Sequence, residues 1–147
     1  MSASAQPAHS PSDPTLAGRT VLVIEDHRDS RELLTQILQS LHAHVLTARN
    51  VEEAEHELGF HRPHLIVCDM KLPDGTRIDF IRWLRASGHK KVRGTPCIAI
   101  TGYEQQFPAN AASDFDAYMR KPINLDKFCS VAVALARQAS PIRWHFV

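Results

Sequence analysis

The chain has 147 residues, with 44% hydrophobic, 7% aromatic and 22% charged side chains, a composition typical of one soluble globular domain. Its formal net charge of +1 excludes a whole-molecule field that would draw the protein onto nucleic acid, and no apolar run reaches the roughly 20 residues that cross a bilayer. The N-terminus lacks the basic and then apolar build of a signal peptide, so we expect a cytoplasmic protein without membrane contact or direct DNA binding.

The two ends of the chain differ from its middle. Residues 1–18 hold three of the nine prolines and four serines, and Leu16 is their only large apolar side chain after the initial methionine. Such a segment buries too little apolar surface to offset the entropy cost of ordering. We predict a disordered arm over residues 1–18, one folded domain over residues 19–139 and a C-terminal tail over residues 140–147. The tail carries large apolar side chains after Pro141, so we expect it to fold back on the domain or to join a dimer contact.

Five short apolar runs within the domain have the length of strands that are buried on both faces. They cover residues 21–24, 45–47, 65–68, 97–100 and 117–119. Neither the three cysteines, which lack CxxC spacing, nor the nine histidines form a metal-binding pattern, and we interpret the histidines as ordinary surface or edge residues.

Segments with helical spacing of apolar residues alternate with these runs. Two helices are expected to begin near Asp29 and Asn50, because each of these residues precedes a glutamate by three positions, as in a reciprocal N-terminal cap. Gly59 is expected to end the second helix, and a third helix is expected to stop near Gly88. Residues 103–113 contain a proline and few large apolar side chains, so we expect a single turn or an irregular loop there, before a last helix that begins near residue 125.

Strand and helix thus alternate five times, which predicts an α/β fold with a doubly wound, five-stranded parallel sheet. In such folds, ligands bind at the carboxyl ends of the strands. The predicted strands end in or lead to polar residues: Glu25, Asp26, Asp69, Thr101 and Lys121. Each alone has an ordinary alternative, as a turn, cap, strand or exposed residue, but their joint occurrence at strand ends favours one site.

A strand order of 2-1-3-4-5 would make the first and third strands neighbours, so that the carboxylates of Glu25, Asp26 and Asp69 crowd together. Raised pKa values or a hard divalent cation would relieve the repulsion, and Mg²⁺ suits one or two carboxylates with water and phosphate oxygens. Lys121 would face the same cluster, where its ammonium group can hold anionic phosphate oxygens.

The four motifs VLVIED, LIVCDMKLPDG, CIAITGY and AYMRKPI occur in this order, and the chain resembles the receiver domain of two-component response regulators over residues 19–139. The resemblance implies a flavodoxin-like (βα)5 fold with strand order 2-1-3-4-5. It also implies roles for individual residues. These are the phosphoacceptor Asp69, the Mg²⁺ ligands Glu25, Asp26, Asp69 and the backbone carbonyl of Lys71, the phosphate-contacting Lys121, the switch hydroxyl of Thr101 and the switch aromatic Tyr118.

From this resemblance we expect a single-domain response regulator receiver, for which a homodimer is one open assembly. It would accept a phosphoryl group from a histidine kinase or a histidine phosphotransfer protein and then change its contacts with a downstream protein. It would catalyse only its own phosphorylation and dephosphorylation, so it is not expected to be an enzyme acting on a small molecule.

Three alternatives remain open. In the first, the chain is a receiver cut from a hybrid histidine kinase, or a phosphorelay sink. In the second, it is an aspartate-nucleophile phosphohydrolase. In the third, it is a structural module whose acids are vestigial. The phosphohydrolase needs an acid two residues after its nucleophile, and Lys71 stands at that position.

Overall fold

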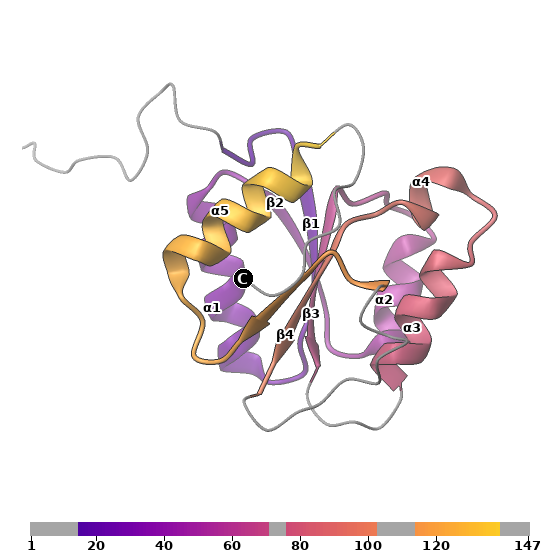
Figure 1. Ribbon diagram of the computed structural model, residues 1–147, viewed down its shortest axis with the longest axis horizontal. Coiled ribbons are helices and arrows are strands. Elements are labelled where there is room, and N and C mark those ends of the chain that lie inside the picture. The colour runs from indigo at the N-terminus through magenta and orange to yellow at the C-terminus, as the bar shows by residue number, and fades with distance from the viewer. Residues whose placement is uncertain (1–14, 71–75, 103–113, 139–147) are drawn as a thin grey trace, which may run out of the picture.

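A five-stranded parallel sheet lies between two layers of helices in the computed structural model, which describes residues 15–70, 76–102 and 114–138 (Figure 1). The strands are β1 (Thr20–Ile24), β2 (His44–Ala48), β3 (Leu65–Met70), β4 (Cys97–Thr101) and β5 (Ala117–Arg120). Their order, β2-β1-β3-β4-β5, confirms the predicted fold class and strand order.

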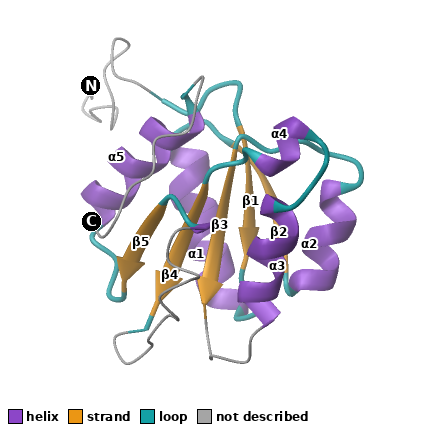
Figure 2. Cartoon of the chain, turned by 45° about the vertical axis from the view of Figure 1, so that its right-hand side comes forward, coloured by secondary structure: helices purple, strands orange, loops and turns teal. Residues whose placement is uncertain are grey.

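Helices cover both faces of this sheet (Figure 2). They are α1 (Arg28–Ser40), α2 (Val51–Leu58), α3 (Thr76–Arg85), α4 (Lys90–Arg93) and α5 (Leu125–Ala136). α1 and α5 pack on one face, while α2, α3 and α4 pack on the other. No helix in the described part of the chain has the length and apolar character needed to cross a membrane.

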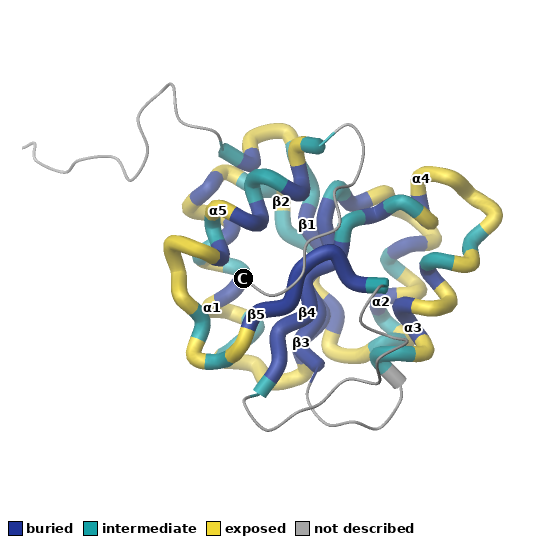
Figure 3. The backbone as a smooth tube through the Cα atoms, in the orientation of Figure 1, coloured by how far each residue is buried: buried dark blue, intermediate teal, exposed yellow. Residues whose placement is uncertain are grey.

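Successive residues of a strand pack into two separate hydrophobic cores, one on each face of the sheet. Val21 and Val23 of β1 pack in the cluster with α1 and α5, whereas Leu22 and Ile24 pack in the cluster with α2 and α3. Both faces of the central strands are therefore buried, and the tube in Figure 3 is dark blue along β3 and β4. This explains why the strands read as continuous apolar runs rather than as alternating patterns.

The two predicted helix starts have different outcomes. Asn50 is the N-cap of α2, and its side-chain oxygen accepts a hydrogen bond from the backbone N–H of Glu53 at 2.8 Å. α1 begins at Arg28, near Asp29 as predicted, but its N-cap is His27 and not Asp29: the His27 Nδ1 accepts from the backbone N–H of Ser30 at 3.3 Å. Asp29 instead lies in the first turn, where a carboxylate is favourable beside the positive end of the helix dipole.

The helix ends also differ in part from prediction. Gly59 is the C-cap of α2, as expected. α3 ends at Arg85, earlier than the predicted stop near Gly88, and the four-residue helix α4 that follows was not predicted. The predicted turn or irregular loop over residues 103–113 lies outside the described residues.

Leu16 corrects the predicted N-terminal boundary. Its side chain is fully buried among α1, α5 and the sheet, and its backbone N–H donates to the carbonyl of Leu41 at 2.8 Å. Gly18 adopts a φ of +77° in the turn into β1, a conformation that glycine reaches without a Cβ clash. The packed chain therefore includes Leu16, which we expected in the arm, while residues 1–14 and the tail over 140–147 lie outside the described residues.

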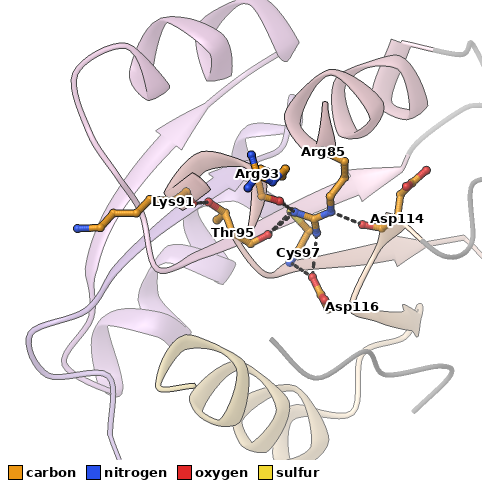
Figure 4. A network of polar contacts seen from close by, with 7 residues as sticks. All are labelled: Arg85, Lys91, Arg93, Thr95, Cys97, Asp114 and Asp116. Atoms are coloured by element: carbon orange, nitrogen blue, oxygen red, sulfur yellow. Dashed lines mark hydrogen bonds and ion pairs between the residues drawn. The ribbon is translucent and has the colours of Figure 1, made fainter. Parts of the chain in front are cut away.

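A largely buried arginine, Arg85, joins the amino ends of β4 and β5 to the end of α3 (Figure 4). Arg85 Nη2 pairs with Asp116 Oδ2 at 2.9 Å, and the same carboxylate oxygen accepts from the backbone N–H of Cys97 at 2.8 Å. The guanidinium also donates to the carbonyls of Asp114 at 2.9 Å and Thr95 at 2.6 Å. The Arg85 side chain thus supplies hydrogen bonds to backbone carbonyls of two loops, one before β4 and one before β5.

We expect Arg85→Ala to lower the free energy of unfolding by about 3 to 5 kcal/mol, because it leaves the buried Asp116 carboxylate without its cation. Urea denaturation measures this loss. The control Arg82→Ala, an exposed position on the same helix, should cost less than about 0.5 kcal/mol. Equal losses in the two variants would contradict a special role for the buried pair.

Candidate functional site

The register of the sheet places the candidate site at the carboxyl ends of the strands. Ile24 of β1 pairs with Cys68 of β3, and Glu25 and Asp69 directly follow this pair. Thr101 ends the neighbouring strand β4. Because parallel strands end at the same edge of a sheet, residues far apart in the sequence become neighbours there.

Asp69 is a buried charged residue at the end of β3. Its side chain is 1% exposed, and its Oδ2 accepts from Lys121 Nζ at 2.9 Å. Its other oxygen, Oδ1, is buried and has no hydrogen-bond partner among the described residues. A buried carboxylate oxygen without a partner is costly, so this atom favours a ligand that brings positive charge.

Lys121 reaches Asp69 from the end of β5. Its backbone N–H donates to the carbonyl of Thr101 at 2.9 Å, which ties the end of β5 to the end of β4. The peptide bond between Lys121 and Pro122 is cis. The lysine side chain is 40% exposed, so the ammonium group faces both the buried carboxylate and solvent.

Glu25 crowds against the other acids. Its side chain is buried, and its Oε2 accepts from the backbone N–H of His27 at 2.9 Å. Burial and the nearby carboxyl group of Asp69 raise the pKa of Glu25 to about 8, with a further contribution from Asp26. The acids therefore lie close enough to perturb one another, although Asp26 itself is exposed.

Two contributions to the site were missed by sequence reasoning. Arg31 Nη1 donates to the backbone carbonyls of Glu25 at 3.1 Å and Asp26 at 3.3 Å, and so fixes the backbone that carries both acids. The backbone N–H of His27 donates to the carboxylate of Glu25. Neither contact has a sequence signal, because each depends on the path of the loop between β1 and α1.

Thr101 and Tyr118 lie on the adjoining strands β4 and β5. The Thr101 hydroxyl is buried and donates to the carbonyl of Met119 at 3.5 Å, near the limit for a hydrogen bond. Tyr118 is also buried, with its ring edge-to-face against Phe115 at a centroid distance of 5.5 Å. Burial raises the pKa of Tyr118 above its ordinary value, so the ring stays neutral.

The donor chemistry of the acidic cluster fits Mg²⁺. Glu25, Asp26 and Asp69 offer hard carboxylate oxygens, and the buried Asp69 Oδ1 lacks a partner within the described ranges. The described residues contain no group of three His, Cys, Asp or Glu side chains arranged to hold a metal ion, so the fit rests on the chemistry of the donors. The backbone carbonyl of Lys71, expected as a further ligand, lies outside these residues.

Comparison with known proteins agrees with this architecture. A family model described as the response regulator receiver domain matches residues 21–132. The chain belongs to this family. The fold likeness extends to the receiver domain of a sensor histidine kinase from Pseudomonas aeruginosa, with a TM-score of 0.71 and 22% identity over 83% of this chain and 100% of that one.

The similar full-length proteins have different sizes. The chain is 29% identical to the response regulator protein PilR of Pseudomonas aeruginosa, over 86% of this chain but only 28% of PilR. It is 26% identical to the polar-differentiation response regulator DivK of Brucella anthropi, over 75% of this chain and 89% of DivK. The chain thus spans a minor part of one receiver protein and nearly all of another.

We expect Mg²⁺ to raise the melting temperature of the protein, and a chelator to reverse the effect, because a ligand that binds only the folded state stabilises it by mass action. At a tenfold excess over Kd the gain is about 1.4 kcal/mol, which corresponds to a few degrees. Differential scanning calorimetry measures the shift.

Asp26→Asn should reduce this Mg²⁺-dependent shift, whereas the control Asp29→Asn, at an exposed acid in the first turn of α1, should retain it. An identical shift in both variants would contradict a role for Asp26 in holding the ion.

Proposed function

We propose that this receiver is a phosphorylation-controlled switch that accepts a phosphoryl group on Asp69. The donor is a phosphohistidine of a histidine kinase or of a histidine phosphotransfer protein. The observation that supports this function best is the Asp69 carboxylate itself, which has one oxygen held by Lys121 and one buried oxygen without a partner in the described residues.

In the proposed transfer, a carboxylate oxygen of Asp69 bonds to phosphorus, and the P–N bond of the donor phosphohistidine breaks. The electron pair of that bond stays with the imidazole nitrogen. Lys121 orients the acceptor and attracts phosphoryl oxygens, and such positioning and charge neutralisation supply most of the catalysis in phosphoryl transfer.

Glu25, Asp26 and Asp69 would hold Mg²⁺, with the carbonyl of Lys71 proposed as a further ligand. When bound, the ion would neutralise charge on the carboxylates and the phosphoryl oxygens. The receiver domain of the Pseudomonas sensor kinase carries a magnesium ion in its active-site cleft, which supports the same ion for this receiver.

The proposed output is a change in protein contacts around β4 and β5. Phosphoryl oxygens on Asp69 would attract the Thr101 hydroxyl, and this costs little because its present bond to Met119 is long, at 3.5 Å. Movement of that hydroxyl alters the space beside Tyr118 on the neighbouring strand. The receiver would thereby change its contact with a downstream protein and act as a single-domain regulator.

The direct test is the intact mass of the protein after incubation with Mg²⁺ and acetyl phosphate. We expect a gain of one phosphate that hydroxylamine removes, as for an acyl phosphate, and no gain with a chelator or in Asp69→Asn. The control Asp29→Asn should be phosphorylated normally. An undiminished gain in Asp69→Asn would contradict the assignment of the acceptor.

Thr101→Ala separates the chemistry from the switch. We expect this variant to gain the phosphate with a rate within a few-fold of wild type, because Asp69 and Lys121 remain in place. The change in the NMR signals of the Tyr118 ring on phosphorylation should disappear, since the hydroxyl that responds to the phosphate is absent. A full Tyr118 response in Thr101→Ala would contradict the proposed coupling.

A further inference from the structure

Two adjacent elements on one side of the sheet carry opposite charge. α2 contacts α3, and α3 contacts α4, so the three helices form one layer (Figures 1 and 2). α2 bears four glutamates within its eight residues. In contrast, residues 80–94 contain five lysines and arginines and no acid.

The acidic part is hollowed. A shallow groove of about 510 Å³ is lined by Glu52, Glu53, His56 and Glu57 of α2, and we call these residues the acidic groove. Glu53 pairs with Arg49 at 2.7 Å, so part of this charge is already compensated, and Glu57 lies 3.6 Å from the ring of His61.

The basic part projects into solvent. Four exposed side chains at the end of α3 and on α4 form what we call the basic ridge: Arg82, Lys90, Lys91 and Arg93. Figure 4 shows the Lys91 side chain extending away from the Arg85 network. Arg85 is excluded from the ridge because Asp116 neutralises it. Among ion pairs between described residues, none joins the ridge to the acidic groove.

Two aromatic side chains accompany these charges. Phe60, just beyond α2, is 74% exposed and contacts the ring of His56 at a centroid distance of 5.1 Å. Trp83 of α3 is 47% exposed and stacks on Phe80, at 5.9 Å between ring centroids. Aromatic residues are enriched at protein interfaces, and tryptophan is among the residues that contribute most to the binding energy.

We propose that the layer of α2, α3 and α4 is a self-association surface, in which the basic ridge of one copy enters the acidic groove of a second copy. A two-fold axis would repeat this contact, so that each copy contributes both its groove and its ridge. Phe60 and Trp83 would provide apolar contact, while the charges set the orientation. This proposal does not depend on phosphorylation of Asp69.

Charge complementarity within one chain favours a second copy as the partner. A two-fold interface requires the same surface on both partners to be self-complementary, and adjacent negative and positive elements meet that requirement. A partner of uniform charge would be attracted to one element and repelled by its neighbour. A second copy rotated by half a turn presents its basic element to the acidic element of the first copy and its acidic element to the basic one.

Charge reversal tests the contact in solution, with the molar mass measured by analytical ultracentrifugation from micromolar to millimolar concentration. We expect a concentration-dependent dimer in the wild type and in Asp69→Asn. Glu52→Lys with Glu57→Lys reverses the groove, and Lys90→Glu with Lys91→Glu reverses the ridge. Each double variant should weaken the dimer by about tenfold or more, because like charges then face each other twice.

Combining the two reversals provides the decisive measurement. An equimolar mixture of the groove and ridge variants should recover the dimer, because both contacts of the mixed pair are again attractive. A single chain with all four substitutions should recover it as well. Glu32→Lys on α1 and Lys127→Glu on α5, exposed positions on the opposite face, should leave the wild-type dimer unchanged.

Three results would overturn the proposal. They are a monomer at every concentration, a dimer that the reversals do not weaken, and reversals that weaken the dimer without recovery in the mixture. If the protein is a monomer, the layer of α2, α3 and α4 is available to bind a different protein. If the dimer is insensitive to the charge reversals, its interface lies on another surface. Melting curves of all variants establish that loss of the dimer is not loss of the fold.

Discussion

The burial of negative charge at one edge of the sheet is the constraint on which the candidate site depends. Glu25 and Asp69 are each 1% exposed, and burial together with the proximity of Asp69 raises the pKa of Glu25. Two buried carboxyl groups repel each other and lose hydration, so they persist only where other groups compensate. Lys121 compensates one oxygen of Asp69, and the backbone N–H of His27 compensates Glu25.

This compensation explains why the remote parts of the fold matter to the site. Lys121 lies beyond β5, a four-residue edge strand that pairs with β4 alone among the described strands. Asp116 stands at the opposite end of β5, where Arg85 and the backbone of Cys97 hold it. The strand that delivers the lysine is therefore fixed at both ends, by a buried ion pair at one end and by Asp69 at the other.

Sequence alone was sufficient for the sheet and for the placement of the strand ends. Those features follow from local apolar runs and from the rule that parallel strands end at one edge. It failed for His27 as a cap, for Leu16 in the core and for Arg85 with Asp116. Each of these depends on the chain path or on a partner distant in sequence, such as Leu41 for Leu16, which local patterns do not encode.

The charged surface on α2 to α4 differs physically from the acidic cluster at the strand ends. Buried carboxylates are held by a few short contacts with fixed geometry, whereas the charges of the groove and the ridge are partly or fully exposed and are screened by salt. Exposed charges contribute little stability to the chain that carries them. Their separation into one acidic and one basic element is therefore better explained by orientation of a partner than by the fold. The exposed side chains of Phe60 and Trp83 beside them support the same explanation.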